Sequence, residues 1–232
     1  MKKHFSIIAC LFMALSSFLV SCGDTKSDSK SDPYSGYIDP YNGHEYVDLG
    51  LPSGIKWATC NVGATKPEEF GGYYAWGETE EKEDYSWSTY KWCNGSSTTM
   101  TKYCTSSNGT VDNKTTLDLE DDVAHVKWGG TWRMPTKAEQ DELRNNCTWT
   151  WTTQNGVNGY KVTGPNGNSI FLPAAGSYAL EGYYGGGRIA FFCTSSLSSD
   201  GSLAYSLFFD SNFCYWINNC RCYGQSVRPV SE

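Results

Sequence analysis

The side chains best suited to acid–base chemistry lie in two acidic runs, over residues 78–84 and 118–122, and in a histidine that follows the second run. Such carboxylates suit calcium ligation or an acid–base pair, and His125 could act as a base beside Asp121 or Asp122. The alternating spacing of a calcium-binding loop is absent, and solvated loop charge with a packed histidine is the simpler interpretation. The sequence also lacks a nucleophile elbow, a phosphate-binding loop and a zinc-protease motif. We therefore expect a protein that is not an enzyme and that needs no metal or cofactor.

Ten cysteines form the second group of reactive side chains, and eight of them follow residue 22. A chain exported to an oxidising compartment can keep disulfides. Cys93 and Cys104 enclose a loop rich in Ser, Thr and Gly, which a disulfide would stabilise by about 3 kcal/mol. Cys60 with Cys147 is the second expected disulfide. A zinc site is disfavoured because only two histidines remain beyond residue 22. The redox state of the other four is left open, namely Cys193, Cys214, Cys220 and Cys222.

The first residues have the layout of an export signal. Two lysines precede an apolar run over residues 5–20, which is too short for a permanent membrane span. The small residue before Cys22 resembles a bacterial lipobox, which implies cleavage there and lipid on Cys22; an ordinary secretory signal is the alternative. Residues 22–43 are polar and small, as in a flexible tether. These features predict a signal peptide over residues 1–21 and a lipid-anchored protein of the outer membrane, exposed at the cell surface, whose anchor makes the membrane a partner.

Composition indicates a folded domain after the tether. The chain has 232 residues with a formal charge of −7, and 15% of its residues are aromatic against 19% charged. That balance supplies apolar area for a core and argues against disorder, while the acidic charge argues against nucleic acid as a partner. The length suits one domain, which we place at residues 44–232.

Turn and capping signals indicate short strands, one clear helix and long loops. Thr136 and Glu139 form a capping box, which begins a helix that runs toward Cys147. Residues 160–163 and 169–172 flank a Gly/Asn-rich loop and form an expected hairpin. The remaining expected strands cover residues 46–49, 55–62, 204–210, 214–217 and 224–230. The predicted fold class is α+β, with mostly antiparallel short strands and few helices.

The strand expected over residues 204–210 has two chemically different faces, because successive side chains alternate along a strand. One face is apolar and suits a core, namely Tyr205, Leu207 and Phe209. The opposite face is mixed, namely Ser206, Phe208 and Asp210. If Phe208 is exposed, the apolar side chains after it would extend a patch of the kind that marks a partner site, namely Phe213, Tyr215 and Ile217. The alternative is that these aromatic side chains pack inward.

Five blocks, taken in order, resemble the Fibrobacter-type major paralogous domain family. They are Asp-Leu-Gly-Leu-Pro-Ser-Gly at 48–54, Trp-Ala-Thr-Cys-Asn-Val-Gly-Ala at 57–64, Trp-Gly-Gly-Thr-Trp-Arg-Met-Pro-Thr at 128–136, Phe-Leu-Pro-Ala-Ala-Gly at 171–176 and Ser-Val-Arg-Pro-Val at 226–230. The resemblance implies a C-type-lectin-like fold of the formylglycine-generating-enzyme type, whose Gly/Trp-rich core supports a ligand-binding face near the carboxyl end. It does not imply that enzyme's activity, because nothing identifies the catalytic cysteine pair, and the lectin calcium motifs are absent.

The segments 188–196 and 212–223 depart from that family pattern. Cys, Phe, Tyr, Ile, Asn, Ser and Arg are interspersed there, with Asp210 just before the second segment, while Trp216 and Gly224 look like fixed framework. All eight of those types have codons ending in C, as mutation of the two adenines of an Asn codon would produce. This resembles the variable proteins of diversity-generating retroelements and implies a face that is rewritten on a constant scaffold, over about residues 186–223. The expected ligand-binding residues are Arg188, Ile189, Phe191, Cys193, Ser206, Phe208, Asp210, Phe213, Cys214, Tyr215, Ile217, Asn218, Asn219, Cys220 and Cys222.

The function expected from the sequence is therefore ligand binding through a diversified face, by a surface lipoprotein that uses no cofactor. The ligand would be a protein or a glycan on another cell or on a phage. Two alternatives stay open: a structural or carbohydrate-associated surface lipoprotein, and an enzyme built on the same fold around His125.

Overall fold

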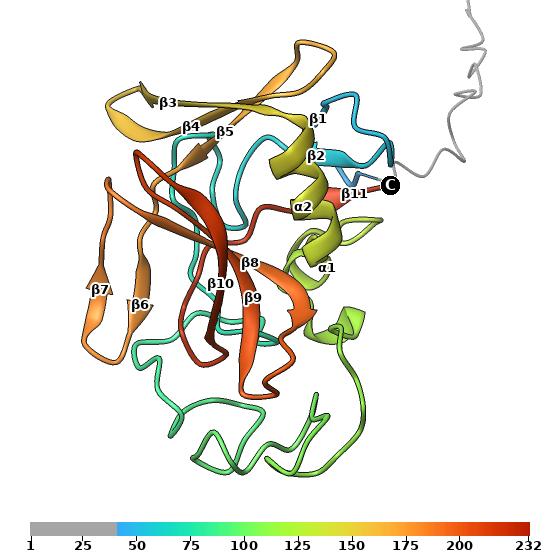
Figure 1. The fold of residues 1–232 in the computed structure, drawn as a ribbon, viewed down its shortest axis with the longest axis vertical. Coiled ribbons are helices and arrows are strands. Elements are labelled where there is room, and N and C mark those ends of the chain that lie inside the picture. Colours follow the sequence, from blue (N-terminus) through green and yellow to red (C-terminus); the bar gives the residue numbers. More distant parts are fainter. Residues whose placement is uncertain (1–40) are drawn as a thin grey trace, which may run out of the picture. The chain divides into compact units, whose positions relative to one another are not determined.

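Antiparallel strands dominate residues 41–232, the part of the chain that this computed structural model describes (Figure 1). These residues hold short strands, two α-helices and long loops, so the expected mostly antiparallel class with few helices is confirmed. The expected signal peptide over residues 1–21, the lipid site at Cys22 and most of the expected tether lie outside the described residues. None of the helices between residues 41 and 232 is long and apolar enough to cross a membrane.

The β structure of the described chain consists of three three-stranded sheets and one hairpin. The first sheet has the order β1-β2-β11, with strands Tyr46–Asp48, Lys56–Ala58 and Val230–Ser231. The second has the order β3-β4-β5, with strands Thr148–Gln154, Val157–Thr163 and Ser169–Pro173. The third has the order β10-β9-β8, with β8 at Ala190–Leu197, β9 at Leu203–Phe209 and β10 at Cys214–Cys220. The hairpin pairs β6 (Ser177–Ala179) with β7 (Gly182–Tyr184).

The helices precede the second sheet. They are a 3-10 helix at Leu119–Asp121, α1 at Val123–Trp128 and α2 at Lys137–Asn146. The expected capping box at the start of α2 is confirmed: Thr136 Oγ1 accepts from Glu139 N at 3.3 Å, and Glu139 Oε2 accepts from Thr136 N at 2.8 Å. The Arg133 guanidinium donates two hydrogen bonds to the Glu139 carboxylate, of 2.8 and 2.6 Å. Glu139 therefore ties the first turn of α2 both to the capping residue Thr136 and to Arg133.

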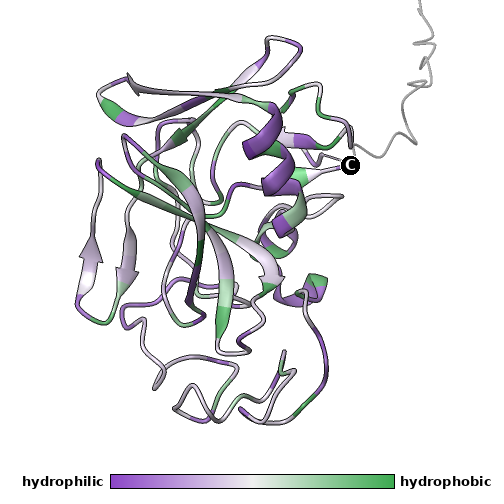
Figure 2. Ribbon diagram, in the orientation of Figure 1, coloured by the Kyte–Doolittle hydropathy of each residue, from purple (hydrophilic) through white to green (hydrophobic). Residues whose placement is uncertain are grey.

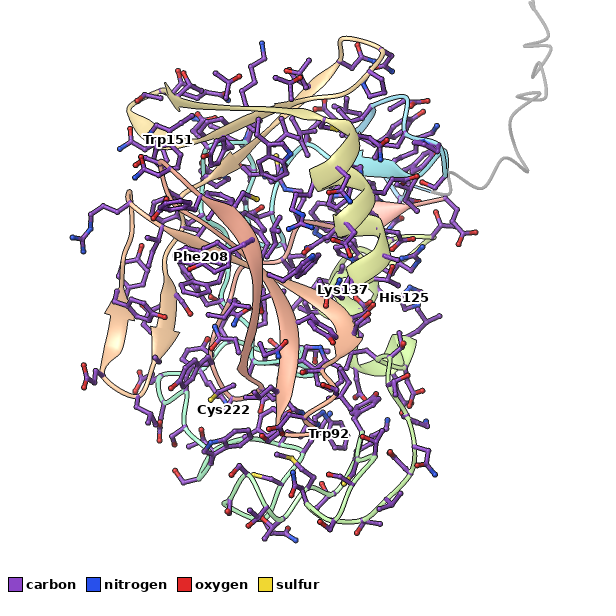
Figure 3. The ribbon with its side chains drawn as sticks, in the orientation of Figure 1. Trp92, His125, Lys137, Trp151, Phe208 and Cys222 are labelled. Atoms are coloured by element: carbon purple, nitrogen blue, oxygen red, sulfur yellow. The ribbon has the colours of Figure 1, made fainter. Side chains whose placement is uncertain are left out.

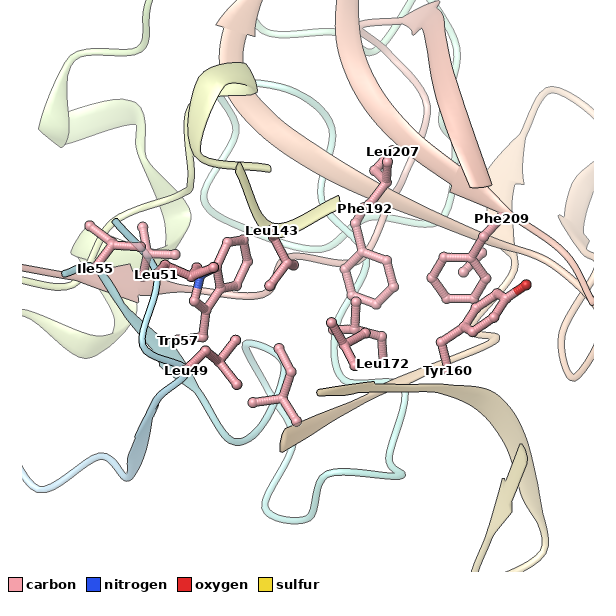
Figure 4. Packing of buried hydrophobic residues seen from close by; sticks show 14 of the residues in the cluster. Leu49, Leu51, Ile55, Trp57, Leu143, Tyr160, Leu172, Phe192, Leu207 and Phe209 are labelled. Atoms are coloured by element: carbon pink, nitrogen blue, oxygen red, sulfur yellow. The ribbon is translucent and has the colours of Figure 1, made fainter. Parts of the chain in front are cut away.

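The main core lies where the three sheets and α2 meet (Figure 4). Trp57 of β2, Leu143 of α2 and Phe192 of β8 are each about 99% buried, and Phe209 of β9 is completely buried. Hydrophobic residues, drawn in green, occur along the strands of this region, whereas much of α2 is hydrophilic and drawn in purple (Figure 2). Burial of these large side chains is the main stabilising term of the fold.

Two fully buried arginines hold the long loops to the strands. Arg228 donates to Asn61 Oδ1 at 2.8 Å and to three backbone carbonyl oxygens, of Ala58, Thr59 and Phe171, at 3.0, 2.9 and 3.0 Å. Arg221 binds the Tyr90 hydroxyl at 2.9 Å and three further carbonyls in the same way. Such a buried guanidinium is tolerated because nearly every donor has an acceptor.

The end of the expected tether belongs to the fold. The Trp132 indole donates to the Tyr41 carbonyl at 2.6 Å, and the Asn42 amide donates to the Trp128 carbonyl at 2.5 Å. The Tyr41 ring also meets the Trp132 ring edge-on, with centroids 5.9 Å apart. The domain therefore begins by residue 41 rather than at residue 44.

The expected disulfides are wrong, because all eight cysteines of the described residues are free thiols. Cys93 Sγ lies 3.2 Å from the Trp87 carbonyl oxygen, and Cys104 Sγ lies 3.2 Å from that of Ser106. The loop between them is ordered by backbone hydrogen bonds of Met100 instead, of 2.7 and 2.8 Å. In the other expected pair, Cys147 packs against the main core, while Cys60 contacts Thr59 Oγ1 at 3.6 Å.

Strand boundaries differ most at the carboxyl end. The strand expected over 224–230 is reduced to β11 and single bridges, such as that between Tyr178 and Gly224. Only Lys56–Ala58 of the strand expected over 55–62 is regular. Backbone hydrogen bonds between loops, such as Val62 N to Val227 O at 3.0 Å, take the place of continuous ladders there.

Candidate functional site

The third sheet turns one face to the core and presents another outward. Its register places Phe191, Phe208 and Tyr215 side by side across β8, β9 and β10. The neighbouring row, which includes Leu207 and Trp216, lies on the opposite face against the core, as alternation requires. The predicted inward positions of Leu207 and Phe209 are confirmed, since both are about 1% exposed or less.

Four aromatic rings form a continuous row on the outward face, which we call the aromatic ladder: Tyr184, Phe191, Phe208 and Tyr215. Successive ring centroids are 6.0, 5.1 and 5.0 Å apart, in tilted or edge-on arrangements that aromatic pairs favour. Phe191 is 5% exposed, but Tyr184 and Tyr215 at the two ends are 39% and 47% exposed. The ladder is therefore buried in its middle and open at its ends. Phe208, which Figure 3 labels near the centre of this sheet, is half-buried.

The turn between β9 and β10 adds the most exposed aromatic residue. The Asp210 carboxylate accepts from Asn212 N at 2.7 Å and from Phe213 N at 2.8 Å, and Asp210 N donates to Phe213 O at 3.0 Å. This side-chain capping holds the turn tightly and leaves Phe213 61% exposed. Asp210 thus shapes the turn, so its carboxylate is already occupied by local hydrogen bonds.

The other half of the outward face is covered by the chain that follows β10. Ser206 Oγ donates to Gln225 Oε1 at 2.6 Å, and Cys193 N donates to Ser226 O at 3.1 Å. Ser206 is consequently 1% exposed and Cys193 3% exposed. The expectation that the whole outward row of β9 is a contact surface is corrected: only the half that carries the aromatic ladder is accessible.

The expected ligand-binding residues divide by exposure. Those exposed at the surface are Arg188, Phe213, Tyr215 and Asn218. Those half-buried are Ile189, Phe208, Asp210, Cys214, Ile217 and Cys220. Those buried are Phe191, Cys193, Ser206, Asn219 and Cys222, and they cannot make direct contact with a macromolecule. Asn218 lies on the opposite side of β10 from Tyr215 and Ile217, since strand neighbours alternate.

Two hollows flank the hairpin of β6 and β7 and extend the face. One, of about 510 Å³, is lined by Trp151, Asn158, Tyr184, Arg188 and Asp210 among others. The other, of about 540 Å³, is lined by Leu180, Tyr183, Tyr184 and Tyr223 among others. Tyr184 lines both, and partial burial raises the pKa of its phenol, which therefore stays neutral at physiological pH. We call the exposed ends of the ladder, Phe213 and these hollows together the aromatic face.

Sequence reasoning missed part of this face. Trp151 comes from β3, a strand not expected, whose alternating Thr and Trp were a usable signal. Tyr183 and Tyr184 precede three consecutive glycines. The glycines indicate a turn, but the sequence does not show where the two tyrosine rings point. Leu180 at the hairpin tip is 65% exposed. These residues reach the face from different elements, so no local pattern could assemble them.

The residues proposed for acid–base catalysis, His125 with Asp121 or Asp122, make structural contacts instead. Asp122 caps α1 by accepting from Ala124 N at 2.9 Å and His125 N at 3.1 Å, and it also accepts from Met134 N at 2.8 Å. His125 Nδ1 lies 3.2 Å from the Trp132 carbonyl oxygen. Within residues 41–232 no hydrogen bond joins the imidazole to either carboxylate of the proposed pair. These contacts stabilise the loop and the start of α1.

The second acidic run surrounds a lysine. Carboxylates of Asp118, Glu120 and Asp121 lie close enough together to hold a cation, and the Lys102 ammonium occupies that position at 2.8, 3.1 and 2.6 Å. These hydrogen bonds outweigh desolvation and raise the pKa of Lys102, so it remains charged. Lys91 also pairs with Asp121 and Lys114 with Asp118, so three ammonium groups balance the three carboxylates.

Comparisons with protein-family models, with curated proteins and with solved structures find no match to this chain.

Proposed function

We propose that this protein is a cell-surface binding protein that recognises a protein partner through the aromatic face. The observation that carries the proposal is the aromatic ladder, whose open ends and neighbouring Phe213 are exposed on a firmly packed sheet. An exposed aromatic cluster on a rigid support leaves apolar area in water, which a partner would cover. Tyr, Phe and Arg are also the side chains that supply most interface energy or are enriched there.

A protein partner is favoured over a glycan by the composition of the face. Tyr215, Phe213 and the half-buried Ile217 give an apolar centre, while Arg188 is exposed at the rim without an ion pair among the described residues. An apolar centre with a polar rim is the usual anatomy of protein interfaces. The carboxylate of Asp210, which a sugar hydroxyl would need as an acceptor, is engaged in its own turn.

The wider setting rests on the resemblances. We propose the C-type-lectin-like fold of the Fibrobacter-type major paralogous domains for residues 41–232, together with an export signal, lipid at Cys22 and outer-membrane exposure. We further propose that the accessible part of residues 186–223 is diversified by a retroelement. The proposal draws support from the expected framework positions, Trp216 and Gly224. The Trp216 indole donates to Asp141 at 2.5 Å, and Gly224 makes backbone hydrogen bonds to Tyr178 of 2.9 and 3.0 Å.

Binding is tested with the purified protein on two arrays, one of bacterial and phage surface proteins and one of glycans. Phe213→Ala combined with Tyr215→Ala should weaken binding to the bound protein by tenfold or more, a loss of about 1.4 kcal/mol or more. Val126→Ala and Leu119→Ala, which truncate similarly exposed apolar residues elsewhere, should not change it. Binding that survives the double variant contradicts the proposal, and binding confined to the glycan array overturns the choice of a protein partner.

Diversification is tested in the DNA. A near-copy of the last forty or so codons next to a reverse transcriptase gene, differing mainly at adenines, is the expected arrangement. The differing codons should include those of Phe213 and Tyr215, and that of Arg188 where the copy extends so far, and should spare those of Trp216 and Gly224. A copy that differs at random positions, or no copy, contradicts this part of the proposal and leaves a structural surface lipoprotein as the better account.

A further inference from the structure

Cys220 and Cys222 lie at the end of β10, in a tight turn that the aromatic face does not use. The turn is closed by a hydrogen bond from Tyr223 N to Cys220 O of 3.1 Å, and Cys220 N is held by Asn219 Oδ1 at 3.0 Å. Cys220 is half-buried, whereas Cys222 is completely buried in a cluster with Cys104 and three tyrosines. Cys222 lies inside the lower part of the molecule in Figure 3. One thiol of the pair is thus reachable from solvent and the other is not.

The residue between the two cysteines fixes the turn rigidly. The Arg221 guanidinium donates to Tyr90 Oη at 2.9 Å and to carbonyls of Tyr103, Gly201 and Lys102 at 3.0, 2.9 and 3.0 Å. Its charged group also stands 4.8 Å from the centre of the Trp76 ring. With Arg221 anchored, the cysteines on either side are held in place, and Cys220 packs against the buried cluster that contains Cys222.

We propose that Cys220 and Cys222 form a redox-active dithiol that closes to a disulfide when the folded protein meets a low-molecular-weight disulfide such as oxidised glutathione. The Cys220 thiolate attacks one sulfur of the reagent, forms a mixed disulfide and releases one thiolate. Cys222 then attacks the Cys220 sulfur, and its proton passes to the departing glutathione thiolate. This forms the Cys220–Cys222 bond and releases the second thiol, so two protein thiols are oxidised and one external disulfide is reduced to two thiols.

The surroundings assign different roles to the two sulfurs. The hydrogen bond from Cys222, opposed by desolvation and by Asp200 and helped by Tyr223, lowers the pKa of Cys220 to about 7. The same hydrogen bond together with burial raises the pKa of Cys222, with Lys82 acting weakly the other way. Cys220 is therefore the attacking thiolate at neutral pH and Cys222 the resolving thiol. This assignment does not depend on the proposed binding function.

Mass mapping tests the proposal directly. The full protein is reduced, freed of reductant, treated with oxidised glutathione while folded, blocked with an alkylating agent, denatured and cut with trypsin. Because trypsin cuts after Arg221, a Cys220–Cys222 disulfide leaves two peptides joined, whereas a reduced pair releases them separately. We expect the joined product, with fragmentation placing the bond on Cys220, because the peptide of residues 189–221 also contains Cys193 and Cys214. Both thiols alkylated after this treatment, or Cys222 joined to Cys104, would overturn the proposal.

Variants separate the two steps. Cys222→Ala should stop at the mixed disulfide and keep glutathione on Cys220, whereas Cys220→Ala should leave Cys222 unmodified. Cys214→Ala is the matched control from the same strand: burial raises the pKa of Cys214 to about 11, so its loss should change nothing. If Cys222→Ala does not fold, Cys222→Ser replaces it.

Alkylation of the folded wild-type protein gives an independent measurement. The rate at Cys220 should rise with pH through a midpoint near 7, because only the thiolate reacts. A midpoint near 9, the ordinary value of a thiol, contradicts the proposal whatever the mapping shows.

Discussion

At the scale of single residues, exposure separates the aromatic side chains that hold the fold from those free to bind. Phe209 and Tyr215 lie on adjacent paired strands, yet Phe209 is completely buried and Tyr215 is 47% exposed. Only the environment distinguishes them, since both are large aromatic residues in regular strands. The same contrast exists between the buried Arg228 and the exposed Arg188.

Phe209→Ala should destabilise the protein by about 3–5 kcal/mol, because it leaves a cavity in the main core. Tyr215→Ala should change the free energy of unfolding by less than about 0.5 kcal/mol, as for most surface positions. Urea unfolding followed by tryptophan fluorescence measures both. Equal losses in the two variants would show that Tyr215 is part of the core and not of a free surface.

Arg228→Met should destabilise the protein by about 3 kcal/mol, because it leaves Asn61 and three buried carbonyls without a donor. The same substitution at the exposed position, Arg188→Met, is the matched control and should have an effect below about 0.5 kcal/mol. Unfolding midpoints in urea provide the comparison. An Arg228 variant as stable as the control would mean that water or a neighbouring group satisfies these acceptors.

At the scale of elements, the loops are held by specific polar contacts and close packing, since regular ladders are few there. Gly224 shows this: a Cβ on it would lie 2.6 Å from a carbon of the Tyr85 ring, whose hydroxyl donates to the Tyr73 carbonyl oxygen at 2.5 Å. The ring cannot withdraw without breaking that bond. Gly224→Ala should therefore destabilise the domain and weaken the pairing of Gly224 with Tyr178. A variant with unchanged thermal midpoint and unchanged amide exchange at Tyr178 would contradict this.

The acidic cluster around Lys102 predicts a pH dependence. Hydrogen bonds from Lys102 and Lys114 lower the pKa of Asp118 from 3.8 to about 2. Because the folded value lies below the unfolded one, ionised Asp118 stabilises the fold above about pH 4, and this contribution is lost as the pH falls toward 2. Lys102→Met should lower stability near neutral pH by roughly 3 kcal/mol, since it leaves the buried Asp121 with only the more distant Lys91 ammonium, at 3.4 Å.

The stability difference between Lys102→Met and the wild type should shrink as the pH falls from about 4 to about 2, because protonated Asp118 no longer needs the ammonium. Thermal unfolding at a series of pH values measures that difference. Lys114→Met, which removes a more exposed partner of Asp118, serves as the control and should cost less. A difference that is constant down to pH 2 would show that the carboxylates do not depend on Lys102.

At the scale of the whole molecule, sequence patterns predicted local features better than they predicted contacts between segments that are far apart in the chain. The capping box at Thr136 and the inward row with Leu207 and Phe209 were predictable because each depends on neighbours in sequence. The disulfide predictions failed because loop composition says nothing of where two thiols point. Burial of Ser206 and Cys193 was not predictable, since the covering residues Gln225 and Ser226 come after β10 and fold back over the face.

The residues of the aromatic face that lie on or next to β9 and β10 were predictable from the sequence, whereas those contributed by other elements were not. Phe208, Phe213 and Tyr215 were predictable from alternation and from the unusual composition of the segment. Trp151 and Tyr184 join them from another sheet and from the hairpin, through contacts that only the folded chain brings about. Such long-range assembly leaves no spacing signal in one sequence.

The central claim is that a rigid framework carries an outward patch whose side chains can be exchanged freely. The most direct measurement is the protease-resistant fraction of a surface-displayed library in which Arg188, Phe213, Tyr215 and Ile217 are randomised together, against a second library randomised at Phe192, Leu207 and Phe209. The account predicts that most variants of the first library stay folded and resistant while nearly all of the second are degraded. Comparable degradation of the two libraries would contradict it.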